Sequence, residues 1–388
     1  MNGPVASKSG QSLERLVMSH RVLVAVGAGG VGKTTVAAAL SMAAALRGRR
    51  VLCLTIDPAR RIGEALGLDA MSSEEQVVDP ARFAGGTRPV TGSLTAMMLD
   101  TKRTFDSLVQ KYSSSSEQAR RLLDNKLYKY VSTSLAGTQE YMAMEKLVEL
   151  RSDPRFDLIV LDTPPTTNAL DFLDAPERLI EALDSSTIRF FRQAWQSTGK
   201  LSLNLLARSA SRVLRGFGRI TGGGFLEAMA QFLAELNDLF GGFKERASAV
   251  RAALRSSEVS FVLVTSPAPM SVQEVLFFSD RLEQAAMPRG AFVVNRVRSA
   301  SAFAGPPPSS DDAAQAAATH GLRLDADAPT RLVAAYADAV RFADLDQRHI
   351  RELGGRAVPV VRLPELPSDV RDLGALVKIA DLLMLGGV

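Results

Sequence analysis

The sequence predicts an α/β fold, in which a doubly wound and mainly parallel sheet of about seven strands carries an α-helical insert. Two observations indicate this class. Short apolar runs rich in β-forming residues recur along the chain, and helix-forming stretches separate most of them. A glycine-rich turn also joins the first run to an alanine-rich stretch of high helix propensity. With 388 residues, of which 46% are hydrophobic, the chain can bury a large core.

Seven apolar runs are predicted to be strands, because each is β-rich and ends in a polar or turn residue. They are residues 21–26, 51–56, 94–99, 158–161, 259–264, 291–294 and 357–361. Residues 36–46, 330–353 and 368–385 are predicted to be helices. Residues 299–328 contain a Gly-Pro-Pro-Pro-Ser-Ser segment and an alanine-rich run, and they are predicted to form a partly mobile loop.

The glycine-rich turn contains the pattern G-x-x-x-x-G-K-[ST], which is typical of a phosphate-binding loop. Its glycines allow backbone N–H groups to form an anion nest, and the next helix offers its positive end. Lys33 is expected to reach the β- and γ-phosphates, and Thr34 is expected to bind Mg²⁺. The residues predicted to bind the nucleotide here are Gly27, Gly29, Gly30, Val31, Gly32, Lys33, Thr34 and Thr35.

Polar residues follow the predicted strands at the edge of the sheet where ligands of such folds bind. Asp162 fits the Walker-B position that holds Mg²⁺, although an aspartate before Pro164 also suits a turn. Asp57 is a candidate to orient the attacking water or to support Mg²⁺, and the alternative is an Asx turn before Pro58. Asn295 is either an adenine-reading amide or a turn residue.

Residues 185–256 are predicted to be a helical insert within a single domain that spans residues 1–388, because only one phosphate-binding loop is present. Apolar side chains recur in the insert at helical spacing between Phe225 and Phe240. Two interpretations stay open: the stripe belongs to a core, or it forms an exposed groove for a partner or client helix.

The composition excludes several classes of protein. The formal charge is only +4, and no basic block with interleaved aromatic residues indicates nucleic-acid binding. The N-terminus has no hydrophobic signal core, and no apolar run approaches the length of a membrane span. The lone cysteine, Cys53, lies in a predicted strand, which fits a reducing compartment. A cytoplasmic location is therefore expected.

Four segments together resemble the ArsA-like ATPase family, and a bacterial ArsA-related subgroup most closely. They are the Gly-x-Gly-Gly-Val-Gly-Lys-Thr-Thr loop from Gly27, Asp-Pro-Ala from Asp57, Asp-Thr-x-Pro-Thr from Asp162 and Val-Val-Asn ending at Asn295. The family includes arsenite-pump ATPases and guided-entry ATPases that deliver tail-anchored membrane proteins. The resemblance implies a deviant Walker A P-loop fold that binds ATP or ADP and Mg²⁺.

The resemblance also implies roles for individual residues. Asp57 would help to position the hydrolytic water, and Asp162 would begin switch II. Asn295 would read adenine, with Pro364 and Glu365 close to the base. The family works as nucleotide-gated dimers, and in the targeting branch closure builds a hydrophobic client groove from the helical insert.

One departure from the family lies in the loop itself, where Ala28 replaces a lysine that reaches the phosphates of the partner subunit. A missing cation of this kind can cost several orders of magnitude in rate. Arg60 and Arg61 are candidate substitutes, with Arg60 expected to be catalytic. Otherwise hydrolysis is slow, or a paralogous partner supplies the lysine, so that both a homodimer and a heterodimer remain open.

The cysteine content is the second departure. Residues 299–345 lack the Cys-x-x-Cys zinc site of the eukaryotic guided-entry branch. Arsenite binding needs several thiolates, which Cys53 alone cannot provide. The sequence therefore predicts a Mg²⁺-dependent ATPase that binds and releases an apolar client or partner. The alternative is a weakly or non-hydrolysing subunit of a heterodimer, and a metalloid efflux ATPase is least favoured.

Overall fold

The computed structural model describes residues 8–56, 61–68, 71–79, 90–125, 128, 138–163, 174–175, 181, 232, 245–298, 307–367, 369–370 and 372–386. The chain divides into two compact units. Unit 1 comprises Met1–Met97, Pro154–Thr167 and Ser257–Val388, and unit 2 comprises Met98–Asp153 and Asn168–Ser256. The expected insert, residues 185–256, falls within unit 2.

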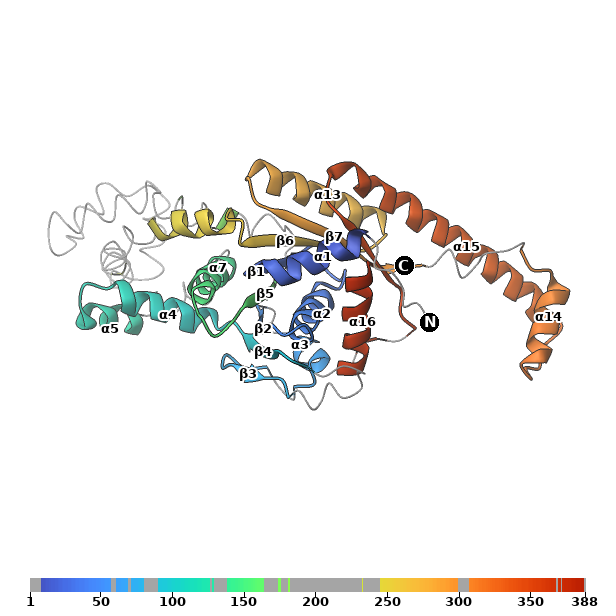
Figure 1. Ribbon diagram of the computed structural model, residues 1–388, viewed down its shortest axis with the longest axis horizontal. Coiled ribbons are helices and arrows are strands. Elements are labelled where there is room, and N and C mark those ends of the chain that lie inside the picture. Colours follow the sequence, from blue (N-terminus) through green and yellow to red (C-terminus); the bar gives the residue numbers. More distant parts are fainter. Residues whose placement is uncertain are drawn as a thin grey trace, which may run out of the picture. The chain divides into compact units, whose positions relative to one another are not determined.

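Unit 1 is built on one eight-stranded sheet with the order β3-β4-β2-β5-β1-β6-β7-β8 (Figure 1). The pairings from β2 across to β8 are parallel, whereas β3 runs antiparallel to β4. This confirms the predicted α/β class. The strands are β1 (Val22–Val26), β2 (Arg50–Thr55), β3 (Gln76–Val77), β4 (Ser93–Met98), β5 (Leu158–Asp162), β6 (Val259–Thr265), β7 (Arg289–Val297) and β8 (Val360–Pro364).

The seven predicted strands are all present, and the eighth strand is β3, whose two residues are too few to show any periodicity. The central strands β1, β5 and β6 are buried along their whole length, as expected for strands covered on both faces. In the sheet, β2 and β5 lie on one side of β1, and β6 and β7 lie on the other side. The direction of the chain across the sheet therefore reverses at β1. The switch point beside β1 is where folds of this kind bind ligands.

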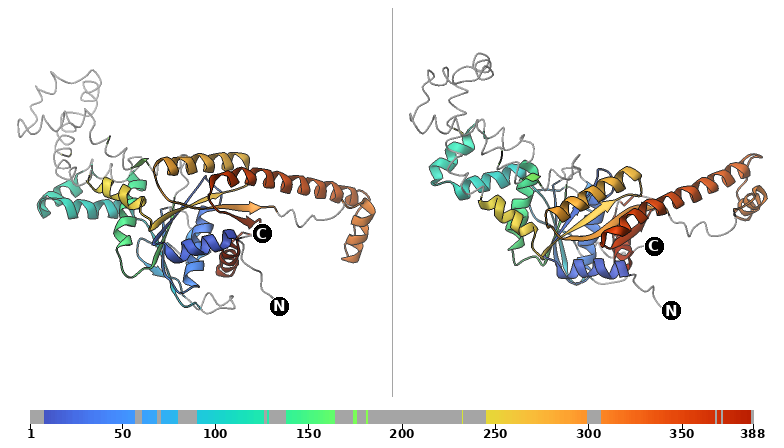
Figure 2. Two further views of the ribbon diagram at one scale, coloured as in Figure 1. Left: turned by 45° about the horizontal axis from the view of Figure 1, so that its top comes forward. Right: turned by 90° about the horizontal axis from the view of Figure 1, so that it is seen from above.

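Helices cover both faces of this sheet (Figure 2). One face carries α1 (Lys8–Ser19), α2 (Lys33–Ala45) and α16 (Leu373–Leu385), and the other carries α13 (Pro269–Gln284) and α15 (Ala328–Leu353). The short helices α3 (Arg61–Ala65) and η3 (Gly354–Arg356) also belong to this unit, and α14 (Ser310–Thr319) packs against α15 at the end away from the sheet.

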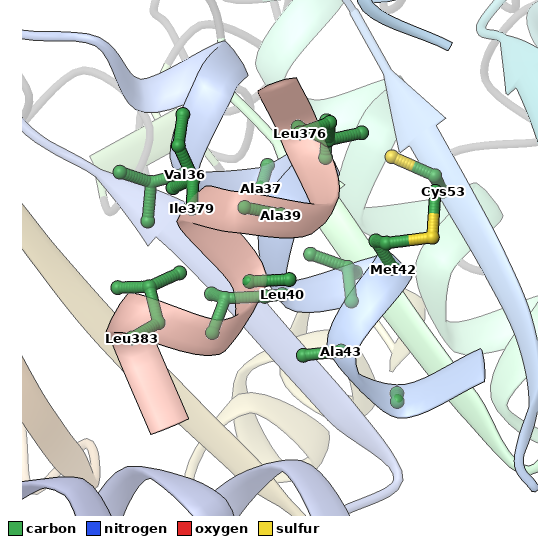
Figure 3. Close-up of a cluster of buried hydrophobic side chains, with 14 of the residues drawn as sticks. Val36, Ala37, Ala39, Leu40, Met42, Ala43, Cys53, Leu376, Ile379 and Leu383 are labelled. Carbon is green, nitrogen blue, oxygen red and sulfur yellow. The ribbon is translucent and has the colours of Figure 1, made fainter. Parts of the chain in front are cut away.

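The helix that follows the glycine-rich turn is buried on all sides. Figure 3 shows α16 lying against α2, with Leu376, Ile379 and Leu383 beside Val36 and Leu40. The alanines of α2 allow this close approach, and a helix that is apolar all round is expected to be enclosed in this way. At the start of α16, Asp372 accepts a hydrogen bond from the backbone N–H of Ala375 at 2.7 Å.

Part of the segment predicted to be a loop, residues 299–328, is helical. Here α14 (Ser310–Thr319) begins with a capping box, in which Ser309 and Asp312 each bond the other's backbone N–H. The prediction of a loop is wrong for these residues, because the capping box and the alanine-rich run favour a helix. The remainder of this segment up to residue 306 lies outside the described residues.

Unit 2 is helical in its described part. It contains α4 (Thr101–Tyr112), α5 (Ser116–Asp124), α7 (Thr138–Arg151) and helical residues 245–254. Within the apolar stripe, Phe232 is described and buried, whereas Phe225 and Phe240 lie outside the described residues. Whether the stripe is a core or a groove therefore stays a prediction.

Candidate nucleotide-binding site

The loop between β1 and α2 has the backbone conformation that an anion nest requires. Gly27, Gly30 and Gly32 have φ angles of 154°, 77° and 96°, in a region that side chains disfavour. A Cβ atom at Gly27 would lie 2.0 Å from the carbonyl oxygen of Val264, and one at Gly32 would lie 2.2 Å from Nδ2 of Asn295. Sterics and φ therefore both require glycine at Gly27, where the clash is with backbone, whereas a side chain at Gly32 would have to displace the amide of Asn295.

Lys33 begins α2 and bends back over the loop. Its buried Nζ donates to the carbonyl oxygens of Gly27 at 2.9 Å and Ala28 at 2.8 Å. The first turn of α2 has no acidic residue, and its N-cap, Gly32, provides no side-chain cap. The positive end of the helix and the lysine charge therefore act together at this loop. Thr34 and Thr35 follow in the same first turn.

Asp162 lies at the end of β5, the strand beside β1. It is fully buried, and its Oδ2 accepts a hydrogen bond of 3.1 Å from Oγ1 of Thr55 at the end of β2. The next residue, Thr163, donates to the carbonyl oxygen of Ala25 at 2.8 Å, which ties this strand end to β1. A carboxylate in this position has the hard oxygen donors that Mg²⁺ prefers.

Asn295 lies against the glycine-rich loop, although its position in the strand differs from the expected one. It was expected just after a strand, but β7 continues through it to Val297. Its Nδ2 donates to the carbonyl oxygen of Val31 at 3.0 Å, and its Oδ1 accepts from the backbone N–H of Arg296 at 3.0 Å. The amide thus holds the loop in place.

An open cavity of about 770 Å³ begins two residues further along β7. Pro364 and Glu365 lie in its lining, and the backbone N–H of Glu365 donates to the carbonyl oxygen of Val297 at 2.9 Å. The cavity is lined by Val297, Arg298, Ala335, Asp338, Ala339, Phe342, Pro364, Glu365, Leu366 and Pro367.

Sequence reasoning missed the contribution of α15 to this cavity. The Arg298 guanidinium lies over the Phe342 ring, 5.1 Å from its centroid, and its Nη1 is 3.1 Å from Oδ1 of Asp346. No local pattern indicated these contacts, because they join Arg298 to residues far along the chain, with Asp346 lying 48 positions away.

Two predicted catalytic residues, Asp57 and Arg60, lie outside the described residues, and Arg61 begins α3 with its side chain undescribed. Their roles stay predictions. Among the residues that the structure describes, no three metal-binding side chains of the His, Cys, Asp or Glu type gather at one place. Cys53 is buried, and burial raises the pKa of its thiol to about 12, so the thiolate that binds soft metalloids is disfavoured.

Comparison with known proteins identifies the family of the chain. Residues 20–303 match the family described as anion-transporting ATPase. The chain belongs to this ATPase family. This confirms the resemblance drawn from the motifs, and the loop from Gly27 to Thr35 falls within the matched range.

Three relatives of this chain show how far the similarity extends. An uncharacterized protein of Streptomyces coelicolor is 33% identical over 164 residues, which cover 42% of this chain and 39% of that protein. An ATPase ASNA1 homolog of Babesia bovis is 30% identical over 161 residues, which cover 41% of this chain and 39% of that protein. The ATPase BagA of Mycobacterium tuberculosis is 23% identical over 385 residues, which cover 95% of this chain and 94% of that protein. The first two matches thus span well under half of each relative.

Within the described part of the chain, no helix combines the length and the apolar character needed to cross a membrane.

Proposed function

We propose that this chain hydrolyses ATP in a Mg²⁺-dependent manner, and that ATP binding and hydrolysis gate a dimer that binds and releases an apolar client or partner. The hydrolytic part rests on one arrangement. The glycine-rich loop connects β1 to Lys33 at the start of α2, and Asp162 is the last residue of β5, which pairs with β1. Triphosphate binding needs the nest and the lysine, and magnesium binding needs the carboxylate.

In this proposal each described residue has a defined task. Lys33 leaves the carbonyl oxygens of the loop and donates to the β- and γ-phosphates, which neutralises charge in the transition state. Thr34 and Asp162 hold Mg²⁺, and the bound ion supplies further neutralisation of phosphate charge. Outside the described residues, Asp57 orients the attacking water, as the family resemblance implies, and Arg60 is the candidate substitute for the cation that Ala28 cannot supply.

The base end of the nucleotide is proposed to lie towards the cavity beside Pro364 and Glu365. Its volume falls in the range of small-molecule sites. Asn295 uses one N–H of its amide on Val31, and an amide has a second N–H that can recognise adenine.

The dimer and the client form the second part of the proposal. They rest on the resemblance to ArsA-like ATPases and on the apolar stripe between Phe225 and Phe240. A homodimer and a heterodimer with a paralogous ATPase both fit, and a cytoplasmic site of action is proposed with either. Ala28 specifically favours a second candidate function, a non-hydrolysing subunit that depends on a partner for its missing cation. Arsenite efflux is disfavoured, since Cys53 is buried.

Steady-state ATP hydrolysis with and without Mg²⁺, together with the mass of the chain in solution with and without ATP, tests the proposal. Turnover that requires Mg²⁺, an ATP-dependent dimer and loss of turnover in Lys33→Ala would support it. Tight ATP binding without turnover would favour the non-hydrolysing subunit. Absence of ATP binding would contradict both.

A further inference from the structure

Strand β7 contains an irregularity directly beside the phosphate-binding loop. Val294 pairs with Arg362 of β8, and Val297 pairs with Pro364, so β7 fits one extra residue between these two pairs. Asn295 and Arg296 of β7 therefore lie opposite the single residue Leu363 of β8, and a bulge of this kind changes the direction of the side chains around it.

The consequence is that two consecutive side chains reach the same loop. In a regular strand neighbouring side chains point to opposite faces. Here Asn295 donates to the carbonyl oxygen of Val31, and Nη1 of Arg296 lies 3.3 Å from the carbonyl oxygen of Gly30. Arg296 has a φ of 61°, which is unfavourable for a side chain of this size and is often found at functional sites.

We propose that Arg296 is a phosphate-binding residue of this site, whose guanidinium contacts the anionic oxygens of the bound nucleoside triphosphate. The inference rests on the proposed function and adds a residue to it. A guanidinium is always charged and matches phosphate oxygens geometrically. Together with Lys33, which lies over Gly27 and Ala28, it places cations at both ends of the glycine segment.

The surroundings of Arg296 leave room for such a contact. Gly29, Gly30 and Arg296 are exposed, whereas Lys33, which bonds the carbonyl oxygens of Gly27 and Ala28, is buried. A Cβ atom built on Gly30 would meet no other atom within 4 Å. Arg296 therefore approaches the loop from its solvent side, and a triphosphate seated in the nest would lie between the two cations.

Binding of three probes to Arg296→Asn tests this role, because asparagine removes the charge and tolerates positive φ. ATP, inorganic tripolyphosphate and adenosine separate phosphate contacts from base contacts. We expect ATP and tripolyphosphate to bind about tenfold more weakly and adenosine binding to be unchanged. Arg296→Lys should recover part of the loss. Arg331→Asn is the matched control. Arg331 is an exposed residue of α15, and it pairs with Asp325, which precedes that helix.

The possible outcomes separate this inference from the proposed function. If Arg296→Asn binds tripolyphosphate as tightly as the wild type while Lys33→Ala does not bind it, Arg296 has no phosphate role and the function stands. An equal loss for adenosine and ATP would assign Arg296 to the base and overturn the inference. If the wild type binds neither ATP nor tripolyphosphate, the proposed function fails as well. Circular dichroism and thermal unfolding of each variant show that a loss of binding is not a loss of fold.

Discussion

The side-chain amide of Asn295 donates to the carbonyl oxygen of Val31 at 3.0 Å, which joins β7 to a loop 264 positions away in sequence. This contact gives Asn295 a positioning role in addition to any contact with the base. Asn295→Ala should therefore weaken the binding of inorganic tripolyphosphate, which has no base, and lower the stability by about 1 kcal/mol. Isothermal titration with tripolyphosphate and urea unfolding measure the two effects. Unchanged tripolyphosphate affinity would show that the loop keeps its conformation without the amide.

Gly32 and Gly30 make a matched pair for a second prediction. Both have positive φ, but a Cβ atom at Gly32 would lie 2.2 Å from Nδ2 of Asn295, whereas one at Gly30 would meet nothing within 4 Å. Both alanine variants carry a backbone cost of about 1–2 kcal/mol. Gly32→Ala also suffers an overpacking cost of about 1–3 kcal/mol, because it must displace Asn295. Denaturant unfolding of the two variants isolates the steric part, and equal destabilisation would argue against it.

The sequence predicted much of this site because a few local patterns carry it. The P-loop motif fixed the positions of Gly27, Gly32 and Lys33, and the apolar run before Asp162 placed that carboxylate at a strand end. The sheet class followed from the alternation of strands and helices, and the boundaries differed by a few residues at most. These features depend on neighbouring residues, so a single sequence contains them.

Other features could not be predicted, because they depend on contacts between distant segments. The bulge that places Arg296 on the loop depends on the register between β7 and β8. The cavity lining depends on how α15 packs against β7, which no motif records. The two-residue strand β3 exists only because β4 is beside it.

The ion pair between Arg50 and Asp157 should make part of the folding stability depend on pH in the acid range. Asp157 precedes β5, and the hydrogen bond from Arg50 at the start of β2 is the main reason why its pKa falls to about 2. A lowered carboxylate pKa stabilises the fold above its unfolded value of 3.8, and this contribution is lost as pH falls towards about 2.

Asp157→Asn should therefore be less stable than the wild type at neutral pH, and the difference should vanish below about pH 2. The effect is small, because the two side chains are 52% and 36% exposed and solvent screens them. Thermal unfolding of both proteins between pH 7 and pH 2 measures it. A stability difference that persists unchanged to the lowest pH would show that the variant acts through packing and not through charge.

Glu145 and Arg246 form an ion pair with a buried carboxylate in unit 2, where the proposed client insert lies. Glu145 on α7 is 1% exposed, and Nε of Arg246 lies 3.0 Å from each of its carboxylate oxygens. The same guanidinium stacks on Tyr112 at the end of α4, 4.7 Å from the ring centroid. Helical residues 245–254 are thus attached to α7 and α4 through one arginine.

Removing only one member of this pair should be costly, because the carboxylate is buried. Arg246→Ala leaves the Glu145 charge without its cation, and the expected cost is about 3–5 kcal/mol. The double variant Glu145→Leu with Arg246→Met should recover only part of this loss, since apolar residues can replace a buried pair, but the buried Tyr141 hydroxyl loses Glu145 as its acceptor. Hydrogen exchange of the amides of residues 245–254 reports the effect within this unit. If the double variant exchanges as fast as Arg246→Ala, the contact with Tyr112, and not the charge pair, holds the helix in place.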